Sequence, residues 1–369
     1  MRFNNFWSYR SILLSGGFFK SVLNSRRNLI AAGAERPLPA GPYMAELDIT
    51  YQCNLRCRMC QRWLDPRRDE LTLAEYGGLA CEFAEMGVHQ ISIAGGEPLL
   101  RPDVFEIIRG FADRGMSVNL CTNGMQVERF RSEIAASGAT CVTVSIDGAD
   151  ADSHDAIRGR DGSFRQIAGG VRALLDARSN GSPLVRVRMT VSDGNVGQIR
   201  RFYDQWRDTA DDVLFQPVHH CSDSYYTGVD TTSSAAAAVH LRAQLRGTRM
   251  EKDPYMRRWA DSMAAGEAFP LAECHAGVLM ARIDPWGNVY PCLEQHVCVG
   301  SVRGSSFGAV WASEAFEQER RRPRTCRCWY NNTAVIGHFG ALLGRTIPNR
   351  KRSLRGTTAP AAPSSSPGG

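Results

Sequence analysis

The chain contains very little lysine and no long apolar run, and both absences narrow the class of protein. Of its 44 basic residues only Lys20, Lys252 and Lys351 are lysines, and arginine supplies the rest. The 38 acidic residues leave a formal charge of +6. The body of the chain has no basic block with interleaved aromatic residues, so we expect no nucleic-acid partner. No run of about 18 uncharged apolar residues occurs, which argues against a membrane-spanning helix.

The first 27 residues also lack the continuous apolar run of a secretory signal, because Gly16 and Gly17 interrupt it and basic residues follow. We therefore expect a cytoplasmic protein. Apolar side chains of residues 1–27 recur near helical spacing at Phe3, Phe6, Trp7, Leu14, Phe18 and Val22. This pattern leaves two interpretations open, a peripheral membrane helix or a helix packed against the main domain.

Short apolar runs alternate with helical patterns through the next part of the chain. Candidate strands cover 43–50, 90–94, 117–122, 141–147, 184–191 and 213–218. Candidate helices begin at Thr72, whose capping box includes Glu75, and cover roughly 103–114, 127–137, 164–178 and 196–208. This order predicts an α/β fold, a partial (β/α)6 barrel of the TIM type, with a small C-terminal domain made of a cysteine-rich β-hairpin and a helix. In such barrels the chemistry lies at the C-terminal ends of the strands.

The predicted organisation has five parts. They are an N-terminal helical extension (1–40), the barrel (41–220), a connecting helical region (221–270), the cysteine-rich domain (271–331) and a basic, Pro/Ser-rich tail that we expect to be disordered (332–369). No internal repeat is evident.

Three of the twelve cysteines, Cys53, Cys57 and Cys60, form a CxxxCxxC pattern directly after the first predicted strand. Clustered cysteines without a secretory signal indicate metal or redox chemistry. Three thiolates can hold three irons of a 4Fe–4S cluster and leave the fourth iron open for a ligand. A structural zinc site completed by a fourth ligand from elsewhere is the alternative.

Further motifs fall at the ends of the following strands. They are "GGEP" (Gly95, Gly96, Glu97, Pro98), "TNG" (122–124), "SIDG" (145–148) and "HDAIRGRDGSF" with Arg158. Paired glycines allow the backbone to approach a ligand closely, and a carboxylate can bind an ammonium group. Each motif alone is typical of a turn, but four in order at successive strand ends indicate a shared site.

With these motifs the sequence resembles the radical S-adenosylmethionine (SAM) enzymes. The resemblance implies that a 4Fe–4S cluster binds to the cysteine loop and cleaves SAM to a 5′-deoxyadenosyl radical, which abstracts a substrate hydrogen atom. It also implies that Met59 contacts adenine and that the GGEP stretch holds the methionine amino group. By the same resemblance Asn123, Ser145 and Asp147 lie near the ribose or carboxylate of SAM, and Arg158 binds the carboxylate.

The C-terminal segment resembles the auxiliary-cluster domains called SPASM and twitch, through "CHAG", "IDPWGNVYPC" and "GSVRGSSFGAVWASEAF". The full SPASM pattern has seven cysteines, whereas four are well placed here, with Cys298 as a candidate fifth. The four are Cys274, Cys292, Cys326 and Cys328, the last two spaced CxC rather than CxxC. One auxiliary 4Fe–4S cluster is the simplest interpretation, and a zinc ribbon or an empty remnant site are the alternatives.

These features lead to a function hypothesis with two alternatives. We expect a radical SAM enzyme that oxidises or otherwise modifies a small biosynthetic intermediate, with the auxiliary cluster as electron acceptor and a flavodoxin or ferredoxin as electron donor. Modification of a ribosomally made peptide or protein is the first alternative, and a non-catalytic metal-binding or redox-sensing protein is the second.

The remaining candidate residues carry weaker signals. His219 and His220 follow the sixth predicted strand, where they could contact substrate or shuttle a proton, or simply be satisfied within a loop. Cys81, Cys121 and Cys141 fall on a helix and two strands, and for these we expect core packing.

Overall fold

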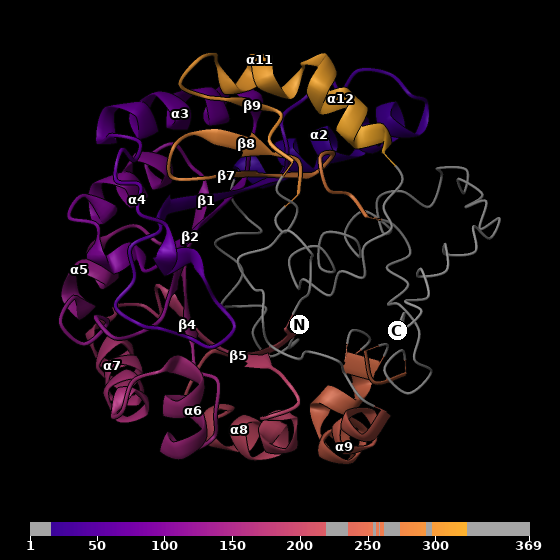
Figure 1. The fold of residues 1–369 in the computed structure, drawn as a ribbon. Coiled ribbons are helices and arrows are strands. Elements are labelled where there is room, and N and C mark those ends of the chain that lie inside the picture. Colours follow the sequence, from indigo (N-terminus) through magenta and orange to yellow (C-terminus); the bar gives the residue numbers. More distant parts are fainter. Residues whose placement is uncertain are drawn as a thin grey trace, which may run out of the picture.

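The structure, a computed structural model, describes residues 16–218, 235–253, 256–257, 259–261, 274–292 and 297–322. Nine strands form one sheet in the order β6-β5-β4-β3-β2-β1-β7-β8-β9. The strands are β1 (Met44–Thr50), β2 (Gln90–Gly95), β3 (Ser117–Thr122), β4 (Cys141–Ser145), β5 (Leu184–Val191), β6 (Asp212–Pro217), β7 (Met280–Ile283), β8 (Asn288–Tyr290) and β9 (Gly300–Ser301). Neighbours from β6 through β1 to β7 run parallel, whereas β8 and β9 are antiparallel additions. Among the described strands β6 and β9 are the edges, so the sheet is an open, partial barrel (Figure 1).

Helices surround the outer side of this curved sheet (Figure 1). The α-helices are α2 (Gly16–Gly33), α3 (Leu73–Met86), α4 (Val104–Ala112), α5 (Arg131–Ala136), α6 (Ala151–Arg158), α7 (Ser163–Ala177), α8 (Ile199–Trp206), α9 (Ala235–Leu245), α11 (Phe307–Trp311) and α12 (Glu314–Arg321). The short 3₁₀ turns are η2 (Arg62–Leu64), η3 (Pro98–Leu100), η4 (Val196–Gln198) and η5 (Arg249–Lys252). Among the helices that the structure describes, none is both long enough and apolar enough to cross a bilayer.

One apolar core lies between the sheet and the outer helices. Phe83 of α3 packs against Phe111 of α4 and Phe307 of α11, with ring centroids 6.1 and 4.8 Å apart, and all three side chains are fully buried. Burial of one such ring contributes roughly 1.5–3 kcal/mol to stability. Because Phe307 comes from the C-terminal segment, this segment shares the core of the barrel.

The inner side of the sheet is polar. In β1, Leu47 and Ile49 belong to the outer core, and the two-residue period of a strand puts Glu46 and Asp48 on the opposite face. Both of these acidic side chains are nevertheless almost completely buried. The barrel interior therefore contains buried carboxylates, which need a partner of opposite charge in the protein or in a ligand.

The sequence-based assignment of strands and helices agrees closely with the structure. Each of the six predicted strands corresponds to one of β1–β6, and α3 begins with the predicted capping box, in which the Thr72 side chain and the Glu75 side chain each bond the other's backbone N–H. Helix α6 was not predicted. The C-terminal hairpin also differs from expectation, because β7 pairs with β1, Met44 opposite Met280, and so extends the barrel sheet.

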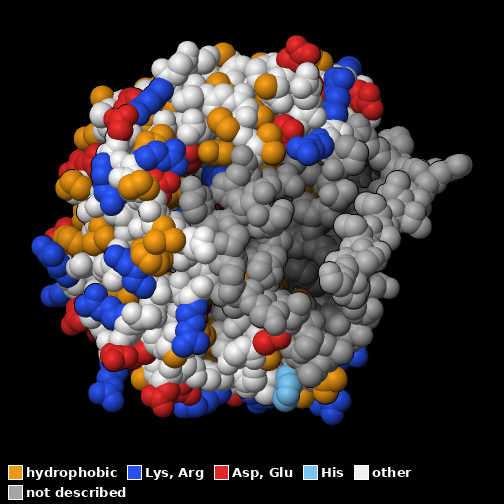
Figure 2. All heavy atoms as spheres, viewed as in Figure 1, with side chains coloured by type: hydrophobic (Ala, Val, Ile, Leu, Met, Phe, Trp, Pro, Cys, Tyr) orange, Lys and Arg blue, Asp and Glu red, His pale blue; other side chains and the backbone are white. Residues whose placement is uncertain are grey.

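The visible surface carries mixed charge. In the view of Figure 2, Lys and Arg side chains alternate with Asp and Glu side chains over the described surface, with scattered apolar side chains between them. Close surface pairs also occur among the described residues, such as Arg200 with Asp204 at 2.7 Å. Pairs of this kind contribute little to stability because solvent screens them.

Candidate active site

A cavity opens at the carboxyl ends of the strands, where a parallel barrel carries its chemistry. Its walls combine the cysteine loop after β1 with residues from the ends of β2–β6. The lining residues are Glu46, Cys53, Cys57, Met59, Cys60, Arg62, Trp63, Ala94, Gly95, Gly96, Cys121, Thr122, Asn123, Ser145, Arg158, Arg188, Thr190, Gln216, Pro217 and Val218. Most of the sequence-predicted site residues therefore meet here. Glu97, Pro98 and Asp147 do not line the cavity and lie behind it.

Side-chain donors from the end of β3 and from the end of α6 point at two of the three thiols. Asn123 Nδ2 lies 3.7 Å from Cys53 Sγ, and Arg158 Nη1 lies 3.8 Å from Cys57 Sγ. The backbone of the cysteine loop also bonds the end of α6, because Arg58 N donates to Ile157 O at 3.0 Å. Such donors stabilise thiolate charge and help to set the potential of a bound cluster.

This donor set fits an iron–sulfur cluster. Burial raises the pKa of the Cys57 thiol to about 11, and the nearby Arg158 opposes that rise. A metal that binds a thiolate offsets this burial cost directly, because the ligand binds in its deprotonated form. In the described part of the chain, no three His, Cys, Asp or Glu side chains lie close enough together to hold a single metal ion. The cysteine ligands of a cluster each bind a different iron, so they are spaced more widely than the ligands of one ion.

The two glycines of GGEP serve a purpose that the sequence alone did not reveal. A Cβ on Gly95 would lie 2.2 Å from Thr50 O, and a Cβ on Gly96 would lie 2.2 Å from Gln52 O. Gly96 N donates to Thr50 O at 2.6 Å, and Gly95 has a φ of +131°. Both glycines also line the cavity, so the close approach to a ligand that the sequence suggests stays a prediction. The structure shows a close approach to the backbone that leads into Cys53.

Glu97 ties the GGEP loop to the end of β3. Its fully buried carboxylate accepts hydrogen bonds from Thr122 Oγ1 at 2.7 Å, Asn123 N at 2.7 Å and Leu99 N at 3.1 Å. Burial raises the pKa of Glu97 to about 7, and these three donors oppose the rise. The carboxylate is therefore engaged by the protein's own donors, and the contact of the GGEP stretch with the methionine amino group stays a prediction.

Asp147 likewise acts behind the cavity. Its Oδ2 lies 2.7 Å from Arg158 Nη2, and its Oδ1 accepts from Thr190 N at 2.8 Å, so one carboxylate joins α6 to β5. The Asp147 side chain is fully buried, and the Arg158 side chain is 8% exposed. Breaking such a buried pair by removing one partner is costly, because the other charge is left uncompensated. Arg158 is thus held in place at the cavity wall beside Cys57.

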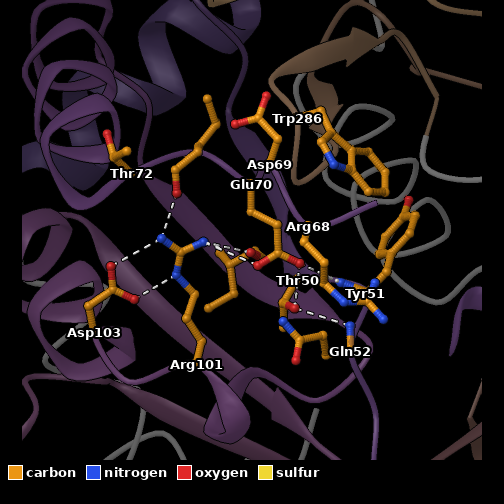
Figure 3. A network of polar contacts seen from close by, with 12 residues as sticks. Thr50, Tyr51, Gln52, Arg68, Asp69, Glu70, Thr72, Arg101, Asp103 and Trp286 are labelled. Atoms are coloured by element: carbon orange, nitrogen blue, oxygen red, sulfur yellow. Dashed lines mark hydrogen bonds and ion pairs between the residues drawn. The ribbon is translucent and has the colours of Figure 1, made fainter. Parts of the chain in front are cut away.

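A second polar network supports the start of the cysteine loop from the other side (Figure 3). Glu70 Oε1 accepts from Thr50 Oγ1 at 2.6 Å and from Tyr51 N at 3.3 Å, while its Oε2 lies 3.7 Å from Arg101 Nη1. Arg101 is paired with Asp103 at 2.6 Å. The segment after the cysteine loop thereby anchors the two residues that precede it.

The C-terminal hairpin contacts this same network. Pro285 O accepts from Leu71 N at 2.6 Å, and the ring of Trp286 packs edge-on against Tyr51 with centroids 5.1 Å apart (Figure 3). Arg303 then bonds the Asp69 carboxylate at 2.8 Å and the Glu75 carboxylate at 3.0 Å. The C-terminal segment therefore braces the polypeptide around the cysteine loop.

Replacing Glu70 with alanine tests this brace. We expect the free energy of unfolding to fall by about 2 kcal/mol, because a mostly buried charged acceptor of two hydrogen bonds is lost. Urea denaturation measures the change, and Glu85→Ala, an exposed carboxylate on α3, is the matched control. An equal change in the two variants would show that Glu70 does not anchor the loop.

Several cavity residues were missed by the sequence analysis. Glu46, Arg188, Thr190 and Gln216 project from β1, β5 and β6 into the cavity, and Arg188 Nη2 donates to Ser145 Oγ at 3.4 Å. The alternation of polar and apolar residues along the strands could have identified them. Parallel strands that are covered on both faces are usually apolar throughout, whereas every second residue of "LVRVRMTV" from Arg186 on is polar. Such a strand has one polar face, which here is the inner one.

The other cysteines divide between core, surface and cavity. Cys141 is buried as expected, but Cys81 is exposed and Cys121 lines the cavity, so core packing was wrong for Cys81 and incomplete for Cys121. Cys274 and Cys292 are partly buried against the core around Leu279 and Met280. Cys298 is exposed. Cys326, Cys328, His219 and His220 lie outside the described residues.

Comparison with known proteins identifies the family. The model of the radical SAM superfamily matches residues 47–211, and that of the SPASM iron–sulfur cluster-binding domain matches residues 274–329. Mycofactocin maturase MftC of Mycobacterium tuberculosis is 30% identical over 322 residues, which cover 84% of this chain and 79% of that protein. An AdoMet-dependent heme synthase of Methanosarcina barkeri is 27% identical over 307 residues, covering 76% and 85%.

A solved structure supports the fold. Streptococcus suis SuiB bound to precursor peptide SuiA superposes with a TM-score of 0.61 at 15% identity, covering 83% of this chain and 72% of that one. Together with the sequence relatives, this likeness accounts for both parts of the chain. The chain belongs to the radical SAM superfamily, and is an iron–sulfur enzyme that uses a 4Fe–4S cluster and SAM and carries a C-terminal SPASM domain for auxiliary iron–sulfur clusters.

Proposed function

We propose that Cys53, Cys57 and Cys60 hold the SAM-binding 4Fe–4S cluster and that SAM binds beside it at the ends of β2–β4. One observation carries this proposal: motifs from four successive strand ends converge on one cavity. The converging residues are the three cysteines, Met59, Gly95, Gly96, Asn123, Ser145 and Arg158. A zinc site would leave the convergence of the last five unexplained.

When bound, the reduced cluster and SAM supply a 5′-deoxyadenosyl radical that takes a hydrogen atom from the substrate. The chain's own residues bind SAM and orient it. Arg158, held by Asp147, presents a guanidinium to the SAM carboxylate, and Met59 offers an apolar contact to adenine. Glu97 acts indirectly, by holding the loop that carries Asn123.

For the SPASM domain we propose one auxiliary 4Fe–4S cluster. Its ligands would be Cys274, Cys292, Cys326 and Cys328. A cluster with four protein ligands has no open iron, so its role would be to accept an electron from the substrate rather than to bind it. A flavodoxin or ferredoxin is the proposed donor for the first cluster.

The polar residues of the inner cavity wall suit a polar substrate. Glu46 and Gln216 are almost completely buried, and with Arg188 and Thr190 they line the cavity across β1, β5 and β6. A guanidinium recognises carboxylate or phosphate oxygens in a paired geometry. We infer a small biosynthetic intermediate with an anionic group that Arg188 binds, which the enzyme oxidises or otherwise modifies.

A peptide substrate is the second candidate, and the relatives favour it. One of them is named a maturase, and SuiB was solved with a precursor peptide. A carboxylate of a peptide could bind Arg188 in the same way. The two candidate substrates then differ in the size of the molecule that must enter the cavity.

Substrate-stimulated release of 5′-deoxyadenosine separates the candidates. Reconstituted enzyme, SAM and reductant are incubated with extract of the source cells, split by size and treated with protease. Stimulation by a small, protease-resistant fraction supports the intermediate, and stimulation that protease abolishes supports the peptide. No release of 5′-deoxyadenosine in any sample would contradict the assignment of the SAM site itself.

Arg188→Gln tests the substrate contact. We expect substrate-stimulated release to fall about tenfold or more, while the slow release without substrate is retained, because a charged contact to the substrate is lost. Arg186→Gln is the matched control. Arg186 lies on the same face of β5 but pairs with Asp212 at 3.2 Å and does not line the cavity. An equal loss of both activities in Arg188→Gln would show that Arg188 serves SAM through Ser145.

A further inference from the structure

Helix α2 packs on the barrel by an unusually polar face. Asn28 is fully buried, and its Nδ2 donates to Gly41 O at 2.9 Å and to Ala40 O at 3.1 Å. Ser25 and Ser21, one and two turns earlier, are 2% and 1% exposed. The buried polar groups of this face form hydrogen bonds within the protein. This line of residues is polar although it faces the protein, where an amphipathic helix usually places apolar side chains, and Leu29 and Ala31 add buried apolar contacts beside it.

The outward face of α2 is apolar. Phe19, Leu23 and Ile30 are 64%, 55% and 41% exposed. They are three of the seven large hydrophobic side chains that are exposed among the described residues, and the other four belong to four different elements. Single exposed apolar side chains are ordinary, but a cluster on one helix is typical of a binding surface.

Basic residues flank this apolar stripe. At about 100° per residue, Phe19, Leu23 and Ile30 fall within an arc of about 40°, with Arg26 on one side and Lys20 on the other. Arg27 lies beside Lys20, and all three basic side chains are exposed. The helix contains no acidic residue, and the first acidic residue of the whole chain is Glu35. The outward surface is thus apolar at its centre and positive at its borders.

We propose that α2 docks this enzyme on an anionic lipid surface. Apolar side chains bordered by lysine and arginine are what an interfacial helix presents to a membrane, where the apolar side chains enter the acyl boundary and the basic ones meet lipid phosphates. The absence of acidic residues through residue 34 adds charge complementarity to such a surface. This inference is independent of the substrate proposal.

The position of α2 keeps the active site accessible in this arrangement. Phe18 packs against His89 with ring centroids 5.6 Å apart, and Asn28 bonds the backbone just before β1. His89 directly precedes β2, so α2 lies at the amino ends of the strands. The cavity lies at their carboxyl ends. A surface bound by the outward face of α2 would leave the cavity opening away from the lipid.

Vesicle sedimentation of the full-length protein tests the proposal. We expect the protein to sediment with phosphatidylcholine vesicles that contain about one third phosphatidylglycerol, to release at high salt, and to remain in solution with phosphatidylcholine alone. Phe19→Ser combined with Leu23→Ser should reduce the bound fraction at least about fivefold. Val239→Ser is the matched control, because Val239 on α9 is 70% exposed and distant from the stripe in sequence.

Three results would overturn the proposal. The first is equal binding of the double variant and the wild type, which would assign any lipid contact to another part of the chain. The second is no binding to anionic vesicles. The third is a concentration-dependent dimer in light scattering that the double variant abolishes without any vesicle effect, which would make the stripe a contact between two copies. Circular dichroism confirms that the variants remain folded, which is expected because both substituted side chains are exposed.

Discussion

Replacing Cys53, Cys57 and Cys60 together with alanine is expected to abolish SAM cleavage and to remove one of about two 4Fe–4S clusters per chain, which is a loss of about four iron atoms. The reason is that all three thiols line the same cavity as Asn123 and Arg158. Iron and sulfide analysis of anaerobically reconstituted protein measures the loss, and 5′-deoxyadenosine release measures the activity.

Cys81→Ala is the control for this experiment, because Cys81 is an exposed thiol on α3 away from the cavity. It should change neither iron content nor activity. If the triple variant kept its iron, the cysteine loop would not be a cluster site. If it lost all iron, including that of the SPASM domain, the two sites would depend on each other, which the contacts between Trp286 and Tyr51 would explain.

Replacing Gly96 with alanine should have an effect almost as large. The added Cβ would lie 2.2 Å from Gln52 O and 2.7 Å from Tyr51 O, both backbone atoms that cannot rotate away. The loop must then move, and with it Cys53 immediately after Gln52. We expect SAM cleavage to fall about a hundredfold or more, because misplacement of a reacting group by about 1 Å has this cost.

The spectrum of the cluster distinguishes a clash with the cysteine loop from a simple loss of space for SAM. If the glycine only made room for SAM, the variant would lose activity with an unchanged cluster signal. Because the clash is with the cysteine loop, we expect weaker iron retention or an altered electron paramagnetic resonance spectrum as well. Gly78→Ala is the matched control, since a Cβ at that position in α3 meets no atom within 4 Å and should raise stability slightly. Wild-type activity in Gly96→Ala would contradict the packing described here.

The sequence was sufficient to predict the six strands, most of the helices between them and the convergence of the motifs at one end of the sheet. Apolar periodicity is a local property, so β1–β6 could be recognised from short runs, and the Thr72–Glu75 capping box from its four-residue spacing. Since parallel strands end at the same edge of a sheet, motifs after successive strands had to converge. That rule brought together Cys53, Asn123 and Arg158, which are up to 105 positions apart in the numbering.

The tertiary structure alone decided what several of these residues do. Glu97 bonds Thr122 and Asn123, and Gly95 and Gly96 contact the backbone before Cys53, whereas the motif by itself suggested only contacts with a ligand. Which face of a strand is inner, and that β7 joins β1, also depend on how the sheet closes rather than on any short segment. The physical reason is the same in each case: a side chain's spacing is set by its neighbours in sequence, whereas its partner is set by packing between segments that the chain brings together only when it folds.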